Sequence, residues 1–202
     1  MNLLITKDEE NDTLGPFFEK CSDIVSSIFK NTANIKQLSS QKLKNGIIFS
    51  MVVSDSKFVP FNFFAFTHGN EYGLIVNNQN YVDCNGNAEY WTKANLIYNY
   101  SCLSACQFGE YSIKQGANCF IGHNKTINVQ TLPKYENYFI DPLKQFMLAL
   151  SENKNVKESL AQAKAQYTAE IDSLYITDIL TASVLLENRD SLVYYGDTSI
   201  TL

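Results

Sequence analysis

The sequence predicts an α/β protein, a three-layer sandwich in which helices cover both faces of a mostly parallel central sheet. Apolar, strand-like runs alternate with segments whose apolar residues recur at helical spacing, which is typical of parallel sheets with right-handed crossovers. The chain has 202 residues, of which 45% are hydrophobic and 18% are charged. This length and composition suffice for a sizeable core, so we expect residues 1–202 to form a single domain.

The first part of the chain alternates strands and helices and ends in the most hydrophobic run of the sequence. Pro16 suits the first turn of a helix, and the apolar residues from Phe17 to Phe29 recur on one helical face. The expected order is a strand at 3–6, a helix capped by Asp12 or Thr13 and extending to 29, a strand at 34–38, a helix from Ser39 or Ser40 to 52, and a strand at 58–67.

The rest of the chain predicts a hairpin with Asn77 and Asn78 at its turn, two further buried strands and three C-terminal helices. A polar stretch from His123 to Asn137 has no periodicity, and we expect it to form a lid or an activation loop. The expected elements are strands at 72–76, 79–83, 96–100 and 119–121, a short amphipathic helix around 108–113, helices from Asp141 onward, at 156–171 and at 176–186, and a last strand at 192–195.

Two of the buried strands end in residues that together form a thiol–imidazole pair. Cys102 follows the apolar run 96–100 where a helix is expected to begin, and a helix N-terminus lowers the pKa of a thiol. His68 follows the apolar run 58–67 and is one of only two histidines in the chain. Because the carboxyl ends of neighbouring parallel strands meet at one edge of a sheet, the two side chains can come together. Cys102 is the candidate nucleophile, and His68 is the candidate base.

Residues next to this pair are the candidates for binding the substrate. Gly69 has no Cβ, so its backbone N–H can approach a substrate carbonyl and serve as an oxyanion donor together with the N–H of Cys102. Asn70 and Ser101 are the adjoining candidates, and Asp83 on the hairpin is a candidate for lining the cleft.

The motifs in this order resemble the caspase-like cysteine peptidases, the clan that includes caspases, metacaspases, gingipains, separases and bacterial CHAT-domain proteases. The likeness rests on a strand ending in Phe66-Thr67-His68-Gly69, a strand ending in Tyr98-Asn99-Tyr100-Ser101-Cys102, and the return Gly-Ala-x-x-Phe-Ile-Gly at 116–122. It implies a caspase-like fold and a His68/Cys102 dyad that hydrolyses peptide bonds without a cofactor or a metal. It also implies a protein or peptide substrate and, as in compact bacterial members, a regulatory protein partner.

The chain departs from the patterns of individual members of this clan. Tyr100 stands where metacaspases carry an acidic residue, and Tyr-Ser-Cys-Leu-Ser replaces the Gln-Ala-Cys-Arg-Gly of caspases. Neither a basic nor an aspartate preference is therefore carried over. Ser104-Ala105-Cys106 imitates the Ser-Ala-Cys of CHAT domains, which makes Cys106 the rival nucleophile. We favour Cys102 because it directly follows the apolar run.

Three alternatives to a peptidase stay open from the sequence. The spacing of Cys102, Cys106, Cys119 and His123 is near a zinc-ligand pattern and would make this stretch a structural metal site. A catalytically degenerate member would use the same cleft to bind a partner. A Cys–His pair is also suited to acyl transfer or thioester hydrolysis.

Composition excludes some classes of partner and location. The net charge of −5 and the absence of Lys or Arg blocks argue against a nucleic-acid surface. The sequence has no signal peptide and no membrane-spanning run, so we expect no membrane contact and a cytoplasmic location. Five cysteines, an odd number, indicate free thiols.

Overall fold

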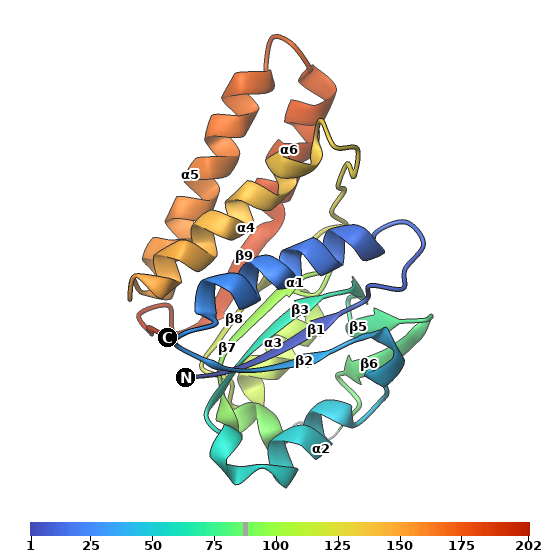
Figure 1. Ribbon diagram of the computed structural model, residues 1–202, viewed down its shortest axis with the longest axis vertical. Coiled ribbons are helices and arrows are strands. Elements are labelled where there is room, and N and C mark those ends of the chain that lie inside the picture. Colours follow the sequence, from blue (N-terminus) through green and yellow to red (C-terminus); the bar gives the residue numbers. More distant parts are fainter. Residues whose placement is uncertain (87–88) are drawn as a thin grey trace.

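The computed structural model describes residues 1–86 and 89–202, which form a six-stranded main sheet with helices on both faces (Figure 1). The strand order is β2-β1-β3-β7-β8-β9, and every neighbouring pair is parallel except β8 and β9. The α/β class with a mostly parallel sheet is therefore confirmed. The strands are β1 (Asn2–Lys7), β2 (Asn34–Leu38), β3 (Phe61–Phe66), β7 (Ala94–Tyr100), β8 (Cys119–His123) and β9 (Leu192–Gly196).

The helices form the outer two layers. On one face, α1 and α4 pack against the sheet, α5 packs on α4, and α6 packs on α5; α2 and α3 cover the other face (Figure 1). No helix in the described part of the chain is long and apolar enough to cross a membrane. The helices are α1 (Gly15–Phe29), α2 (Ile47–Ser54), α3 (Gln107–Lys114), α4 (Glu136–Ser151), α5 (Val156–Leu174) and α6 (Ile179–Ser191), with 3₁₀ turns at Ser40–Lys42, Ser56–Phe58 and Glu89–Lys93.

The alternating side chains of the strands build two separate cores, one on each face of the sheet. On β3, Phe64 and Phe66 belong to the core under α1 and α4, whereas Phe63 and Ala65 belong to the core above α2 and α3. All four side chains are buried. A strand buried on both faces reads as a continuous apolar run, which explains why this segment is the most hydrophobic of the sequence.

A second, three-stranded antiparallel sheet extends from the carboxyl edge of the main sheet. It consists of β4 (His68–Asn70), β5 (Gly73–Val76) and β6 (Gln79–Asp83). The predicted hairpin is confirmed: Asn77 and Asn78 connect β5 and β6 with φ values of 52° and 60°, the left-handed conformation that asparagine tolerates. The sequence did not predict β4, which places His68 in a strand.

Four helix starts differ from the prediction, one of them that of α6, which begins at Ile179 and not at 176. The helix expected from Ser39 or Ser40 to 52 is broken, because Gly46 adopts φ 79° and α2 begins only after it. The N-cap residue of α1 is Leu14, not Asp12 or Thr13. The Asn11 side chain accepts a hydrogen bond from the backbone N–H of Leu14. The helix expected from Asp141 begins at Glu136, because burial of its first turns outweighs the cost of Pro142 in the interior.

Candidate active site

Two strand ends lie side by side at the carboxyl edge of the main sheet. β3 and β7 are parallel neighbours, and their register pairs Phe66 with Tyr100, the last residue of each strand. The chain therefore leaves the sheet at the same level in both places, shortly before His68 and shortly before Cys102. The carboxyl edge is where α/β sheets bind their ligands.

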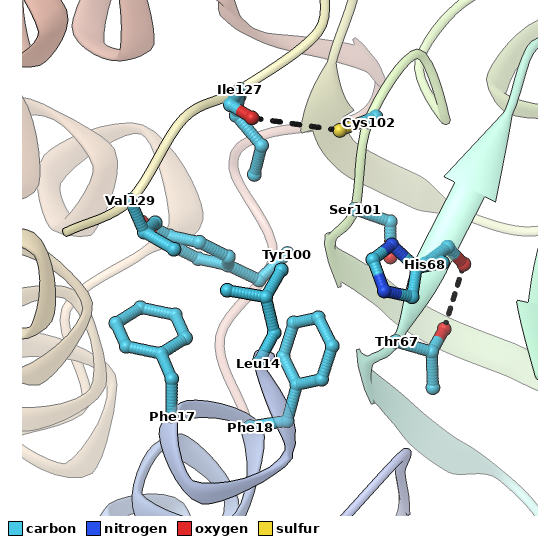
Figure 2. A pocket seen from close by; sticks show the side chains of 10 residues that line it. All are labelled: Leu14, Phe17, Phe18, Thr67, His68, Tyr100, Ser101, Cys102, Ile127 and Val129. Carbon is cyan, nitrogen blue, oxygen red and sulfur yellow. Dashed lines mark hydrogen bonds between the residues drawn. The ribbon is translucent and has the colours of Figure 1, made fainter. Parts of the chain in front are cut away.

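A small, mostly apolar pocket lies at these strand ends, and both candidate catalytic residues line it (Figure 2). The volume of the pocket, including the solvent-filled part at its opening, is about 280 Å³. The start of α1 forms one wall, and the segment that follows β8 forms another. The lining residues are Leu14, Phe17, Phe18, Thr67, His68, Tyr100, Ser101, Cys102, Ile127 and Val129.

The His68 ring is half-buried and held by an aromatic contact. Its centroid lies 5.6 Å from that of Phe18, at an interplanar angle of 87°. The Thr67 hydroxyl donates a hydrogen bond to the His68 carbonyl at 3.1 Å, which fixes the backbone at this point. Figure 2 shows the ring beside Ser101, at the side of the pocket opposite Phe17.

The Cys102 thiol is half-buried and faces the segment after β8. Its Sγ donates to the carbonyl oxygen of Ile127 at 3.7 Å, and Figure 2 shows the sulfur turned toward that carbonyl. The next residue, Leu103, has φ 57°, an uncommon conformation for a residue with a branched side chain. A sharp, strained turn thus follows the candidate nucleophile.

The prediction that a helix begins at Cys102 is wrong. A turn occupies residues 101–106, and α3 begins only at Gln107, so Cys102 does not sit at the N-terminus of a helix. The polar turn residues Ser101 and Ser104 delay the helix, because the Ser104 hydroxyl donates to the Ser101 carbonyl at 3.2 Å.

The backbone of Gly69 lies against the turn that carries Cys102. A Cβ atom on Gly69 would lie 2.8 Å from the carbonyl oxygen of Cys102 and 2.9 Å from Cβ of Ser101, so only glycine allows this approach. Gly69 belongs to β4, the edge strand of the small sheet, so one row of its backbone groups is not used in pairing with β5. Ser101 is buried, and its hydroxyl has no hydrogen-bond partner among the described residues.

The other two candidate binding residues lie outside this pocket. The Asn70 side chain closes the turn between β4 and β5, because its Oδ1 accepts the backbone N–H groups of Tyr72 at 2.8 Å and Gly73 at 3.0 Å. Asp83 lies at the far end of β6 and lines a different cavity with Tyr81 and other residues. The fold therefore brings together His68, Gly69, Ser101 and Cys102, but not Asn70 and Asp83.

A polar cavity adjoins His68 and Gly69 on the other side. Its empty space is about 990 Å³, and acidic residues from the loop after β1 line it, among them Asp8 and Glu10. Asp8 is 2% exposed and accepts the Ser40 hydroxyl at 3.0 Å. Burial raises the pKa of the Asp8 carboxyl above its usual value, although the Ser40 hydrogen bond and His68 act in the opposite direction.

An extended segment from Asn124 to Gln130 contributes Ile127 and Val129 to the wall of the apolar pocket, and we call it the strap (Figure 2). It includes the Ile127 carbonyl and is attached to α6 by Asn188, whose side chain bonds to the backbone of Asn128. The strap lies within the polar stretch for which the sequence predicted a lid, and that role stays a prediction.

Sequence reasoning missed the apolar wall of the site and the anchor of the strap. Phe17 and Phe18 were assigned to the core face of a helix, without a role at the sheet edge. The signal was available, because a helix that follows a parallel strand begins at the carboxyl edge and its first turn faces the ligand site. Nothing in the local pattern marks Asn188, which lies 60 residues from Asn128.

The alternative zinc pattern does not form a site. Among the described residues, no group of three or more His, Cys, Asp or Glu side chains could hold a metal ion. Cys119 is buried in the core, where burial first and Asp197 second raise its pKa to about 12. The Nδ1 atom of His123 pairs with the Ser191 hydroxyl at 2.8 Å, and the Cys106 thiol donates to the Asn124 carbonyl at 3.5 Å.

No protein-family model matches the sequence, and no curated protein matches it either. Several solved structures are similar to it, among them the following two. One is an inactive zymogen of a C11 protease from Parabacteroides distasonis, with 12% identity, a TM-score of 0.44, and coverage of 66% of this chain and 50% of that chain. The other is a secreted C11 cysteine protease from Bacteroides thetaiotaomicron in complex with an irreversible peptide inhibitor, with 9% identity, a TM-score of 0.46, and coverage of 83% and 59%.

The structure is thus similar, at low sequence identity, to bacterial C11 cysteine proteases, which are caspase-like. This chain spans between 50% and 59% of the length of the two proteases.

Proposed function

We propose that this protein is a cysteine peptidase in which Cys102 is the nucleophile and His68 is the general acid and base. The observation that carries the proposal is the pocket at the ends of β3 and β7, which both residues line. A thiol and an imidazole from adjacent strand ends, a glycine backbone against the turn that carries the thiol and an apolar pocket beside both make up the parts that acyl-group transfer to a thiol requires.

The proposed reaction has two stages. His68 accepts the proton of the Cys102 thiol, and the thiolate sulfur attacks the carbonyl carbon of the scissile peptide bond. His68 then donates that proton to the amide nitrogen as the C–N bond breaks, leaving a thioester on Cys102. A water molecule, deprotonated by His68, attacks the thioester and releases the carboxylic acid, and the thiol is restored.

Backbone groups stabilise the oxyanion in this proposal. The negative charge on the carbonyl oxygen would be held by the N–H groups of Gly69 and Cys102. The close approach of Gly69 to the Cys102 turn supports this role, since a side chain at position 69 would push the two backbones apart. Fixed backbone donors need no rearrangement during the reaction, which is the source of their effect on the rate.

A second candidate function is binding of a peptide without cleavage. The observation that favours it is the thiol of Cys102, which donates to the strap carbonyl at Ile127 and has no hydrogen bond to His68 among the described residues. A cleft of the same shape without a productive dyad would bind partners and not cut them.

A peptide-library cleavage assay on the wild-type protein and on Cys102→Ala separates the two functions. A peptidase gives cleavage products that are absent with Cys102→Ala and strongly reduced with His68→Ala. If the wild-type protein and Cys102→Ala produce the same products at the same rate, Cys102 is not the nucleophile. A protein that binds library peptides without cutting any of them has the second function.

A further inference from the structure

We propose that the pocket at His68 and Cys102 binds an uncharged, apolar side chain of the substrate, at the residue whose carbonyl carbon Cys102 attacks. This inference rests on the proposed peptidase function and adds the class of substrate. It is drawn from the chemistry of the pocket wall, which differs sharply from that of the acidic cavity on the other side of His68.

The wall of the pocket is built mainly from hydrocarbon. Leu14, Phe17 and Phe18 come from the start of α1, and Ile127 and Val129 come from the strap, so the two sides of the pocket are aliphatic or aromatic. Figure 2 shows these side chains pointing into the space in front of Cys102. An apolar substrate side chain placed there would be removed from water, which contributes roughly 25 cal/mol for each Å² of apolar surface buried.

The polar groups in the pocket are uncharged or already engaged. The Thr67 hydroxyl donates to the His68 carbonyl, and the Tyr100 hydroxyl donates to the Phe139 carbonyl at 3.4 Å. The Ser101 hydroxyl has no partner among the residues described, but it is neutral. None of the residues that line the pocket is Asp, Glu, Lys or Arg.

A charged substrate side chain would therefore find no Asp, Glu, Lys or Arg partner in this pocket, and the His68 imidazole is engaged in the proton transfers of the proposed reaction. Moving a charge out of water without such a partner is strongly unfavourable, so lysine, arginine and aspartate are disfavoured at this position. Asp8, whose carboxyl interacts electrostatically with His68, lines the other cavity and accepts a hydrogen bond from the Ser40 hydroxyl. The apolar pocket and not the acidic cavity contains Cys102, so it is the pocket next to the attacked carbonyl.

The first experiment measures labelling of Cys102 by three peptidyl acyloxymethyl ketones that differ only in the residue next to the reactive group: leucine, arginine or aspartate. Intact-mass spectrometry follows the rate, and Cys102→Ala identifies the site. We expect the leucine probe to react on the order of tenfold or more faster than either charged probe. A faster reaction with arginine or aspartate, or equal rates, overturns the apolar pocket and leaves the nucleophile in place. If none of the probes modifies Cys102, the proposed peptidase function itself fails.

The second experiment places a charge in the pocket wall. Val129→Glu should shift the ratio of the arginine rate to the leucine rate by about tenfold toward arginine, because the new carboxylate would pair with the guanidinium. Val129→Gln has the same size without the charge and should keep the leucine preference. Leu132→Glu adds the same charge just beyond the strap at a residue that is 64% exposed, and it should keep the wild-type ratio. If a folded Val129→Glu protein keeps the wild-type ratio of the arginine rate to the leucine rate, the pocket does not hold the substrate residue next to the attacked carbonyl, and the inference is overturned.

Discussion

The Asn188 side chain on α6 forms hydrogen bonds with both backbone polar groups of Asn128. Its Oδ1 accepts the Asn128 N–H at 3.2 Å, and its Nδ2 donates to the Asn128 carbonyl at 2.7 Å. Asn188 is 1% exposed. Residues on both sides of Asn128 line the pocket, since the Ile127 carbonyl accepts the Cys102 thiol and Val129 forms part of the wall. This buried amide is therefore one of the contacts that hold the strap beside the candidate nucleophile, together with the hydrogen bond from the Leu103 N–H to the Lys125 carbonyl at 3.1 Å.

Asn188→Ala should loosen the strap. The change leaves the backbone of Asn128 without two hydrogen bonds, so we expect the free energy of unfolding to fall by about 1–3 kcal/mol and Cys102 to become more accessible. The measurement is the rate of Cys102 alkylation by iodoacetamide under native conditions, read by mass spectrometry.

Gln130→Ala is the matched control for the strap. It removes one hydrogen bond, from the Gln130 amide to the Thr181 hydroxyl at 3.0 Å, and leaves the Asn128 anchor intact. We expect a smaller change in the alkylation rate than with Asn188→Ala. Equal rates in Asn188→Ala and the wild-type protein would show that the anchor does not control access to the thiol.

Gly69→Ala should disrupt the site through its backbone. The new Cβ would meet the Cys102 carbonyl oxygen at 2.8 Å, so β4 must move away from the Cys102 turn. We expect peptidase activity to fall at least about tenfold and the free energy of unfolding to fall by about 1–3 kcal/mol. The measurements are kcat/KM and urea unfolding.

Gly86→Ala provides the comparison for this substitution. Among the described residues, the nearest atoms to its new Cβ lie at 3.8 Å, an ordinary contact, so activity and stability should stay near the wild-type values. If Gly69→Ala is as active as Gly86→Ala, the close approach of the two backbones has no part in catalysis.

The layers of the fold could be predicted because each depends on a local pattern. The run at Phe61–Phe66, apolar except for Asn62, predicts a strand buried on both faces, and the helical spacing in Gly15–Phe29 predicts the helix that covers it. β4 could not be predicted in this way. His68–Asn70 has no apolar pattern, and it is a strand only because it pairs with β5.

The candidate pair could be located from the sequence, but not its surroundings. His68 and Cys102 each follow a recognisable strand, so the topology places them at one edge. The environment of the thiol depends on non-local contacts with the strap and on the turn that delays α3, and neither leaves a periodic signal. This is why the helix-dipole argument for Cys102 is wrong although the position of the residue at the sheet edge is not.

Stability should fall on acidification because of His123. The pKa of this histidine is lowered from 6.5 to about 3, and burial is the largest cause. A hydrogen bond with the backbone of Asn188 raises the pKa, and the positive charge of Lys164 lowers it further. Between these pKa values the unfolded chain binds a proton that the folded protein does not. The stabilisation from neutral His123 is therefore complete above the pKa of His123 in the unfolded chain, and it is lost as the pH falls toward the pKa of His123 in the folded protein. Between pH 7 and pH 5, the free energy of unfolding should fall by about 2 kcal/mol.

Urea unfolding of the wild-type protein and of His123→Gln at pH 7 and pH 5 measures this contribution. The loss of stability should be about 2 kcal/mol smaller in His123→Gln, which has no imidazole to protonate. Ser191→Ala removes the hydrogen-bond partner of Nδ1 but keeps the ring buried, so it should retain the pH dependence. An equal pH dependence in His123→Gln and the wild-type protein would contradict the role of His123.

Cys106 tests which cysteine is the nucleophile, since Ser104-Ala105-Cys106 imitates the motif of CHAT domains. Cys106 caps α3, a position that favours a reactive thiol. However, burial first, and then Glu71 and Glu110, raise the pKa of its thiol above the usual value. Its S–H donates to the Asn124 carbonyl, and the residue is not among those that line the pocket with His68.

We therefore expect Cys106→Ala to keep full peptidase activity and to lose about 1–2 kcal/mol of stability, because a half-buried thiol is replaced by a smaller side chain. Cys102→Ala should abolish turnover with little effect on unfolding. Parallel cleavage assays and urea unfolding on the two variants decide the assignment. Activity lost in Cys106→Ala but kept in Cys102→Ala would move the nucleophile to the start of α3. The backbone N–H of Cys106, which donates to the Leu103 carbonyl at 3.0 Å in this structure, would then have to be released to serve as the oxyanion donor, and the pocket at His68 would no longer be the site of chemistry.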